Sequence, residues 1–401
     1  MSRRVILSIV CGALALPGAA TARSLSLRSF DGTKLHTNFF AAAGLRHAHR
    51  APTVLMGPGW GSPGDTNAND STAPSLGTVG VGTLRRAGFN VVTWDPRGFG
   101  KSGGTVEVDS PKFEGRDVSS IISWLARQPQ ALLDHRGDPR VGMAGGSYGG
   151  GIQLVAAGID HRIDAIVPDI AWHSLVTSLY KSNTGKLGWA SLLYLAGRAA
   201  GRLDPLIGES YQAEVAGTPL NAAELGFYAS RGPGDLVGRI TAPTLLVQGT
   251  ADNLFTLQEA VTNYEILRRH GVPVKMLWFC GGHGICLTNP GKTSEITTDT
   301  IAWLDRYLKD EPKRRIGSVF EWVDQNGAEH TGRDYPLAAR KPLTATGSGT
   351  LPLSTAGGSG PVTGVPSSAG PLAAAVAPIT PAKAANAVNI TVGAPAHSAL
   401  V

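Results

Sequence analysis

The chain alternates short runs of β-branched and apolar residues with longer segments that repeat their apolar residues at helical spacing. Residues 118–125 show this spacing at Val118, Ile121, Ile122 and Leu125, the i, i+3, i+4, i+7 pattern of an amphipathic helix. Such alternation predicts an α/β fold with a doubly wound, mostly parallel sheet that has helices on both faces. The expected strands are residues 53–56, 89–94, 140–144, 163–167, 244–247 and 274–279, after a hairpin formed by 24–30 and 35–40.

One long stretch interrupts the alternation. Residues 172–238 carry helix-like apolar spacing and several glycine breaks, and they are too long for a simple crossover loop. We expect them to form a helical cap, inserted between core segments 23–171 and 239–316, over the carboxyl edge of the sheet.

Both ends of the chain differ in composition from this core. Residues 1–22 combine Arg3 and Arg4, an apolar stretch and an Ala-Thr-Ala cleavage site, which predicts a signal peptide and an exported protein, secreted or in the cell envelope; a membrane anchor is the alternative. Residues 317–336 contain Asn-Gly, typical of a hairpin. Residues 337–401 are rich in Ala, Gly, Pro, Ser and Thr, and we expect a linker or tail, or the beginning of a further domain.

Charge and hydropathy exclude several classes of protein. The formal net charge is +6, but only 16% of residues are charged and no run of five like charges occurs, so a nucleic-acid partner is not expected. No unbroken apolar run of membrane-spanning length occurs, which argues against a stable membrane span in the mature chain. The oligomeric state is left open.

Two cysteines remain after the expected leader is removed. Cys280 and Cys286 are six positions apart, and in an exported protein this pair predicts a disulfide, with two free thiols as the alternative. A zinc site is not expected, because only His283 lies near the pair and four ligands are needed.

The strongest chemical motif is Gly-Gly-Ser-Tyr-Gly at residues 145–149, between an expected strand and an expected helix. In this context G-x-S-x-G is typical of a nucleophile elbow, where small neighbours allow a serine to occupy a sharp, strained turn. Ser147 is therefore the candidate nucleophile. An ordinary glycine turn is the alternative.

A nucleophilic serine needs a base and an acid that orients it. His283 follows the last expected strand of the core in a glycine-rich turn and is the first candidate for the base, with His173 as the next. Asp252 follows the penultimate strand and completes the order Ser, Asp, His, while Asp169 is the rival acid.

The oxyanion of an acyl-transfer reaction needs two N–H donors. Tyr148, which follows the candidate nucleophile, is expected to supply one backbone N–H. The turn at residues 57–60 is expected to supply the other, from Trp60, since Pro58 has no N–H.

Several of these motifs carry a family resemblance. Residues 95–102 read Asp-Pro-Arg-Gly-Phe-Gly-Lys-Ser, and together with Gly-Gly-Ser-Tyr-Gly-Gly, Gly-Thr-Ala-Asp and Gly-Gly-His-Gly they resemble the α/β-hydrolases, in particular the Xaa-Pro dipeptidyl-peptidase-like, cocaine-esterase-like branch. The resemblance covers residues 25–335 and implies Ser147 as nucleophile, Asp252 as acid and His283 as base. Members of that branch often place a tyrosine hydroxyl in the oxyanion hole, where this chain has Gly-Pro-Gly-Trp.

We therefore expect an exported serine hydrolase that cleaves a carboxylic ester or amide of a small molecule or peptide, without a metal or organic cofactor. A dipeptidyl peptidase is the first alternative. It would need an acidic group for the free amine, and Glu209, Glu214, Glu224 and Asp235 are candidates. A non-catalytic surface- or carbohydrate-binding module on a hydrolase scaffold is the second alternative.

Overall fold

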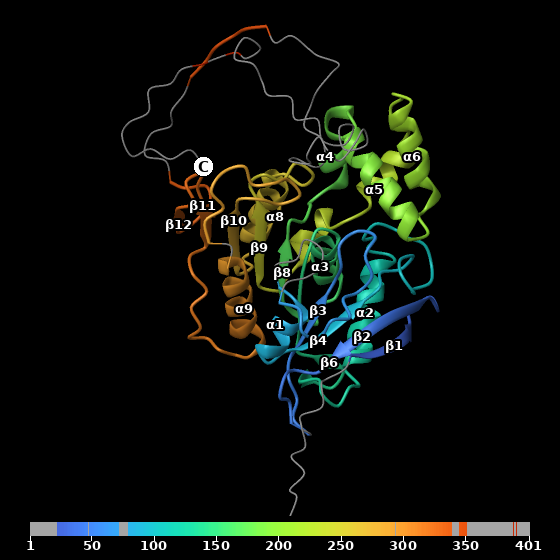
Figure 1. The fold of residues 1–401 in the computed structure, drawn as a ribbon, viewed down its shortest axis with the longest axis vertical. Coiled ribbons are helices and arrows are strands. Elements are labelled where there is room, and N and C mark those ends of the chain that lie inside the picture. The colour runs from blue at the N-terminus through green and yellow to red at the C-terminus, as the bar shows by residue number, and fades with distance from the viewer. Residues whose placement is uncertain are drawn as a thin grey trace, which may run out of the picture.

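The structure, a computed structural model, describes residues 22–46, 48–71, 79–292, 294–338 and 345–350, with residues 388 and 390. The part described contains a large sheet (Figure 1), whose strands are β1 (Arg23–Arg28), β2 (Lys34–Phe40), β3 (Thr53–Met56), β4 (Asn90–Trp94), β7 (Val141–Gly146), β8 (Ile163–Asp169), β9 (Thr244–Gly249), β10 (Val274–Phe279), β11 (Phe320–Val323) and β12 (Glu329–Gly332). They lie in the order β1-β2-β4-β3-β7-β8-β9-β10-β11-β12.

The strands from β4 to β11 in this order are parallel, and antiparallel pairs occur only at the two sides of the sheet. The central strands β3 and β4 are buried along their whole length, as expected of strands covered on both faces. The predicted doubly wound α/β fold is confirmed.

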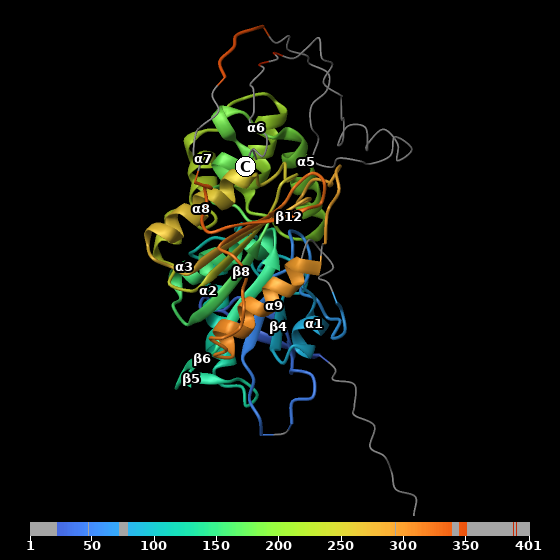
Figure 2. The same cartoon turned by 90° about the vertical axis from the view of Figure 1, so that its left-hand side faces the viewer.

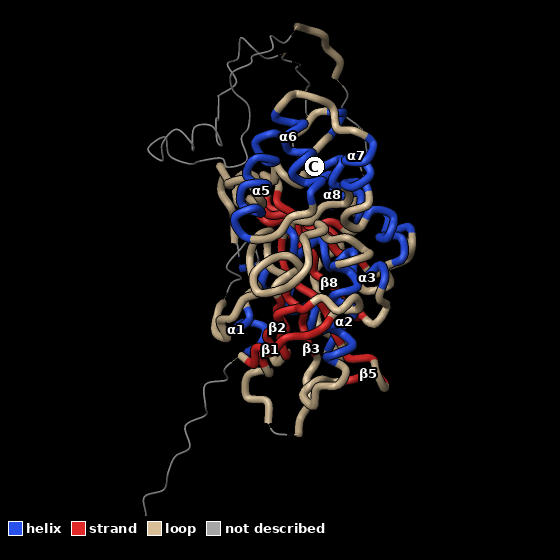
Figure 3. The backbone as a smooth tube through the Cα atoms, turned by 90° about the vertical axis from the view of Figure 1, so that its right-hand side faces the viewer, coloured by secondary structure: helices blue, strands red, loops and turns tan. Residues whose placement is uncertain are grey.

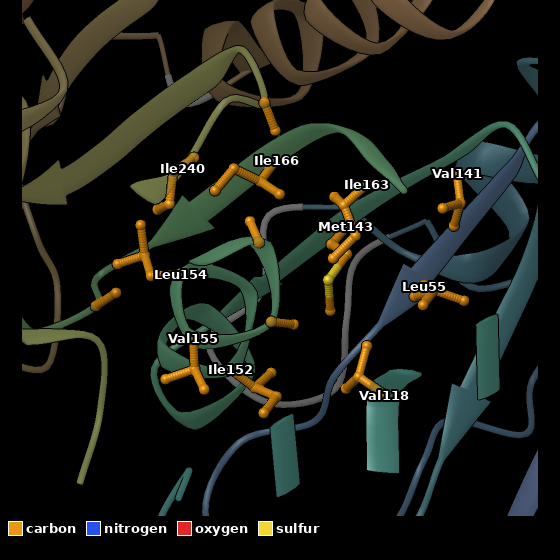
Figure 4. Close-up of a cluster of buried hydrophobic side chains, with 14 of the residues drawn as sticks. Leu55, Val118, Val141, Met143, Ile152, Leu154, Val155, Ile163, Ile166 and Ile240 are labelled. Atoms are coloured by element: carbon orange, nitrogen blue, oxygen red, sulfur yellow. The ribbon is translucent and has the colours of Figure 1, made fainter. Parts of the chain in front are cut away.

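Helices cover both faces of the sheet (Figure 2). On one face lie α2 (Glu114–Leu125), α3 (Tyr148–Ile159) and α8 (Leu257–Arg269), and on the other lie α1 (Val81–Arg86) and α9 (Ser294–Leu308). The apolar spacing of α2 places Val118, Ile121, Ile122 and Leu125 in the first of these layers, each with no exposed surface. Figure 4 shows Val118 there with side chains of β7, β8 and α3. Burial of each such side chain stabilises the fold by about 2 kcal/mol.

A third group of helices lies beyond the carboxyl ends of the strands (Figures 1 and 3). These are α4 (Leu175–Leu179), α5 (Leu187–Ala200), α6 (Pro205–Val215) and α7 (Ala222–Ala229), with the 3₁₀ turn Lys181–Asn183; a second 3₁₀ turn, Gly234–Arg239, packs instead beside α3. Local sequence explains where two of them begin: Asp204 caps α6 ahead of Pro205, and Asn221 forms a capping box with Glu224 at α7. Their apolar side chains pack on core residues such as Phe99, Tyr148 and Phe255.

The residues after α9 continue the same sheet. β11 pairs in parallel with β10, and β12 returns antiparallel through a turn at Asn326-Gly327, where Gly327 has a φ of 80°. The hairpin is thus an extension of the central sheet.

The structure differs from the sequence-based expectations in details. Helix α1 begins at Val81, and residues 72–78, which precede it, lie outside the described part. A small ribbon of β5 (Leu133–His135) and β6 (Asp138–Pro139) was not expected, since each strand is too short to show a pattern. The predicted signal peptide and most of the predicted tail lie outside the described residues. Within the described residues, no helix is both long and apolar enough to cross a membrane.

Candidate active site

Ser147 lies between the end of β7 and the beginning of α3. Its backbone has φ 56° and ψ −119°, a region that costs a residue with a side chain about 1–3 kcal/mol. The turn is held by a hydrogen bond from the Ser147 N–H to the carbonyl of Asp169 at 2.9 Å. It also requires small neighbours: a Cβ on Gly149 would collide with the carbonyl of Gly57. This geometry explains the glycines of the motif.

The structure brings Ser147, His283 and Asp252 together. Ser147 Oγ lies 2.8 Å from His283 Nε2, and His283 Nδ1 lies 2.7 Å from Asp252 Oδ2. A carboxylate only accepts, so Nδ1–H is the donor, which leaves Nε2 as an acceptor for the serine hydroxyl. The three side chains come from turns that follow β7, β9 and β10, whose carboxyl ends meet at one edge of the sheet.

Backbone donors hold Asp252 in place. Its Oδ1 accepts the N–H groups of Leu254 and Phe255 at 3.0 and 2.8 Å, and its Oδ2 also accepts the N–H of His283 at 3.1 Å. The imidazole is enclosed by the rings of Trp189 and Phe255, at centroid distances of 5.7 and 5.1 Å. The acid and the imidazole are therefore buried and fixed in direction.

The two rival residues lie elsewhere. His173 Nδ1 lies 2.8 Å from Asn263 Oδ1, and no contact joins its ring to Ser147. Asp169 Oδ1 is buried with no hydrogen-bond partner in the described part of the chain. Burial first, and then the charge of Asp252, raises the pKa of Asp169 well above its usual range.

The expected N–H donors lie around the same turn. Tyr148 is the first residue of α3, where a backbone N–H has no partner within the helix. The rings of Trp60 and Tyr148 pack edge to face at 5.3 Å, and the indole Nε1 of Trp60 donates to the carbonyl of Leu193 at 2.8 Å. The Tyr148 hydroxyl points into the core, where it accepts the N–H of Asp109 at 3.3 Å.

A cavity of about 80 Å³ opens at Ser147, between the sheet and the third group of helices. Its lining is almost entirely apolar or aromatic: Trp60, Val108, Tyr148, Trp172, Leu175, Leu179, Tyr180, Ala190, Leu193, Tyr194, Ile207, Tyr211, Leu220, Tyr228, Leu254 and Phe255. Of the four acidic candidates for an amine anchor, only Glu214 lines it. Glu224 caps α7, while Glu209 and Asp235 are exposed.

Sequence reasoning missed one contact that joins the helices to the site. Lys186 Nζ, at the beginning of α5, donates to the carbonyls of Asn253 and Leu254, both at 2.9 Å. Trp189 Nε1 donates to Asn253 Oδ1 at 3.2 Å. These bonds hold the turn that carries Asp252. No local pattern could have revealed them, because 64 or more positions separate the partners.

The cysteines lie beside the imidazole. A disulfide joins Cys280 and Cys286, whose Cα atoms are 5.2 Å apart, and its loop contains His283. In the described ranges, no three His, Cys, Asp or Glu side chains are grouped so that they could hold a metal ion.

Comparison with known proteins assigns the chain to a family. The family model described as X-Pro dipeptidyl-peptidase (S15 family) matches residues 31–284, well over half of the chain. An uncharacterized 31.7 kDa protein of Escherichia coli is 37% identical over 86 residues, which are 21% of this chain and 28% of that protein.

Solved structures share the fold at low sequence identity. A CocE/NonD family hydrolase from Staphylococcus aureus has a TM-score of 0.58 at 16% identity, over 81% of this chain and 57% of that one. An aminopeptidase from a marine sediment Thaumarchaeota archaeon has a TM-score of 0.59 at 17% identity, over 82% and 62%. An α-amino acid ester hydrolase has a TM-score of 0.55 at 16% identity, over 84% and 63%. The chain thus spans about three fifths of the length of these structures.

These matches confirm the predicted α/β-hydrolase fold and the resemblance noted in the motifs. The chain belongs to the X-Pro dipeptidyl-peptidase (S15) family.

Proposed function

We propose that this chain is an exported serine hydrolase that cleaves a carboxylic ester through a covalent acyl-enzyme. The observation that carries the proposal is the hydrogen-bonded series Ser147–His283–Asp252 at the wall of an apolar cavity. Family membership supports hydrolytic chemistry of this kind.

In the proposed mechanism, Ser147 Oγ attacks the substrate carbonyl while His283 Nε2 takes the hydroxyl proton. Asp252 holds the tautomer and stabilises the imidazolium that forms. The backbone N–H groups of Tyr148 and Trp60 are the proposed donors to the oxyanion. His283 then returns the proton to the leaving alcohol, and water attacks the acyl-enzyme by the same route in reverse.

Two further parts of the proposal concern the rest of the chain. Residues 172–238 would act as the cap that selects the acyl group, since most of the cavity lining comes from them. Residues 1–22 would direct export, which is consistent with the disulfide at Cys280 and Cys286.

The second candidate is a peptidase that releases a dipeptide, favoured by the name of the matching family. The nearly apolar cavity favours an ester, because a peptide places several amide groups in the site and each needs a hydrogen-bond partner.

A labelling and turnover experiment on the mature full chain tests the proposal. A fluorophosphonate probe should label the wild type and not Ser147→Ala, and Ser147→Ala should lose at least about 10³-fold in kcat on p-nitrophenyl butyrate. Ser120→Ala, at a half-buried serine of α2 whose hydroxyl donates to the carbonyl of Arg116, serves as the matched control and should keep both. Absence of labelling in the wild type would favour a binding module, and cleavage of Ala-Pro-p-nitroanilide without ester turnover would favour the peptidase.

A further inference from the structure

Glu214, in the second half of α6, contributes the one carboxyl group among the described residues that line the cavity. Its neighbours in the lining include Tyr180, Tyr211 and Leu220. Ser147 lines the same cavity from the sheet. A group bound at the serine and extending toward α6 therefore meets this carboxyl.

The carboxyl of Glu214 is not used by the fold. Oε2 is buried without a hydrogen-bond partner in the described part of the chain, and no ion pair in that part includes Glu214. Burial alone raises the pKa of Glu214 to about 7. A buried polar atom without a partner destabilises the protein, so its retention in a substrate cavity indicates a partner that arrives with the ligand.

Three tyrosine hydroxyls of the lining already have partners. Tyr180 Oη accepts the N–H of Leu220 at 3.1 Å, and Tyr194 Oη accepts from Arg198 at 3.2 Å. Tyr228 is hydrogen-bonded to Ser210. Among the described residues of the lining, Glu214 thus offers an unengaged carboxyl acceptor, and Trp172 Nε1 is a buried donor without a partner.

The scarcity of free acceptors around Glu214 favours a hydroxyl over an ammonium as the ligand group that hydrogen-bonds to its carboxyl. An ammonium carries three donors and a full charge, and each donor needs an acceptor when it is buried. A hydroxyl carries one donor, which Oε2 of Glu214 satisfies, and it can also accept from the carboxyl when that is protonated.

We propose that Glu214 determines specificity in this cavity, by forming a hydrogen bond with a hydroxyl at the far end of a short apolar acyl chain whose carbonyl is attacked by Ser147. The inference rests on the proposed function and extends it to a substrate class, the esters of short hydroxyalkanoic acids. The cavity of about 80 Å³ is small beside the several hundred Å³ of typical ligand sites, which favours a short chain.

Matched esters test this inference. Ethyl hexanoate, ethyl 6-hydroxyhexanoate and ethyl 6-aminohexanoate, with the eight-carbon counterparts, are compared by acid release for the wild type, Glu214→Leu, Glu214→Gln and Glu209→Leu. Glu209 lies on the same helix but is exposed, so Glu209→Leu is the matched control.

In the wild type, kcat/KM for the hydroxy ester should exceed that for the plain ester at least tenfold at one of the two lengths. The ratio of kcat/KM for the hydroxy ester to that for the plain ester should fall to 1 or below in Glu214→Leu. In Glu214→Gln, whose amide oxygen still accepts a hydrogen bond, the ratio should stay within about threefold of wild type. It should be unchanged in Glu209→Leu.

Equal ratios in the wild type and Glu214→Leu, or a preference for the amino ester, would overturn the inference. If Glu214→Leu does not fold, the wild-type ratio decides, and a value below three at both lengths overturns it. Loss of the proposed function is distinguishable: no variant, including the wild type, would then hydrolyse any of the esters, or Ser147→Ala would hydrolyse them as fast as the wild type.

Discussion

Asp169 is the last residue of β8 and Asp252 follows β9, yet their carboxyl groups have different surroundings. Asp252 accepts three backbone N–H groups and the His283 ring, whereas Asp169 Oδ1 has no partner in the described residues. Burial, which penalises the charged form, raises the pKa of Asp169 well above its usual range.

Substitution of each acid by its amide separates their roles. We expect Asp252→Asn to lower kcat on p-nitrophenyl butyrate by about 10⁴-fold, because an amide no longer holds the imidazole in the tautomer that accepts the serine proton. Asp169→Asn should change kcat by less than about threefold. Steady-state kinetics with a Tm measurement for both variants checks this, and an equal loss in the two would contradict it.

The raised pKa of Glu214 predicts that the stability of the protein depends on pH. Its pKa is about 7 in the folded protein, above the value near 4.5 of an exposed glutamate, so the folded state binds the proton more tightly. Below about pH 4.5 the carboxyl is protonated in the folded and the unfolded protein, so Glu214 does not lower the free energy of unfolding. As pH rises through 7, the buried group loses its proton and the free energy of unfolding falls. The Tm of Glu214→Gln should therefore gain a few degrees on wild type between pH 5 and 8. A constant Tm difference across that range would show that the group is not buried.

At the scale of elements, the site depends on the close approach of two turns, one after β3 and one at the beginning of α3. Gly149 lies against the carbonyls of Gly57 and Pro58, at a distance that leaves no room for a Cβ. Because Tyr148 and Trp60 belong to these turns, the distance between the two turns determines the geometry of the proposed oxyanion hole.

Gly149→Ala should lower kcat at least tenfold, because the added methyl group must push the two turns apart. Gly226→Ala is the control: it lies within α7 with no atom near an added Cβ, and it should stabilise the protein by up to about 1 kcal/mol. Kinetics and thermal unfolding of both variants give the measurement. A fully active Gly149→Ala would show that the spacing does not matter.

The disulfide loop is the second element that controls the site. It restrains a short segment that contains His283, and closure of so small a loop contributes about 2 kcal/mol in the chain-entropy model. Cys280→Ser with Cys286→Ser should lower kcat about tenfold while Tm falls by only a few degrees, because the sheet does not depend on the loop. Two titratable thiols in the unreduced mature protein would contradict this expectation.

At the scale of the whole molecule, a buried cation joins the carboxyl-terminal hairpin to the core. Lys275 of β10 is 2% exposed, and its Nζ lies 2.6 Å from Asp299 of α9 and 2.8 Å from Glu321 of β11. One lysine thus connects three consecutive elements of the chain.

Lys275→Ala should lower the free energy of unfolding by about 3 kcal/mol, because it leaves two largely buried carboxylates without a cation. Lys292→Ala should change it by less than about 1 kcal/mol, since that exposed lysine lies 3.5 Å from Glu329. Urea denaturation measures both, and kcat of the folded variants should stay within twofold of wild type. Equal effects of the two substitutions would refute the role given to Lys275.

Much of the fold could be predicted because its signals are local. The expected strand at residues 53–56 matches β3, and the apolar spacing of α2 and the hairpin signal at Asn326-Gly327 agree with the structure. The β5–β6 ribbon could not be predicted, since two or three residues carry no periodicity. Parallel pairing of β11 with β10 was equally hidden, because it joins strands separated by α9.

By itself, the sequence determined the order of strands and helices and the sharp turn at Ser147, because periodicity and small residues act on the adjacent backbone. It left open whether Asp252 or Asp169 meets His283, and which of four acidic residues lines the cavity at Ser147. Only the tertiary structure decided these, since a hydrogen bond over 31 or 136 positions depends on where the sheet edge and the overlying helices place each side chain. Burial, which raises the pKa of Glu214 and of Asp169, belongs to the packed molecule alone.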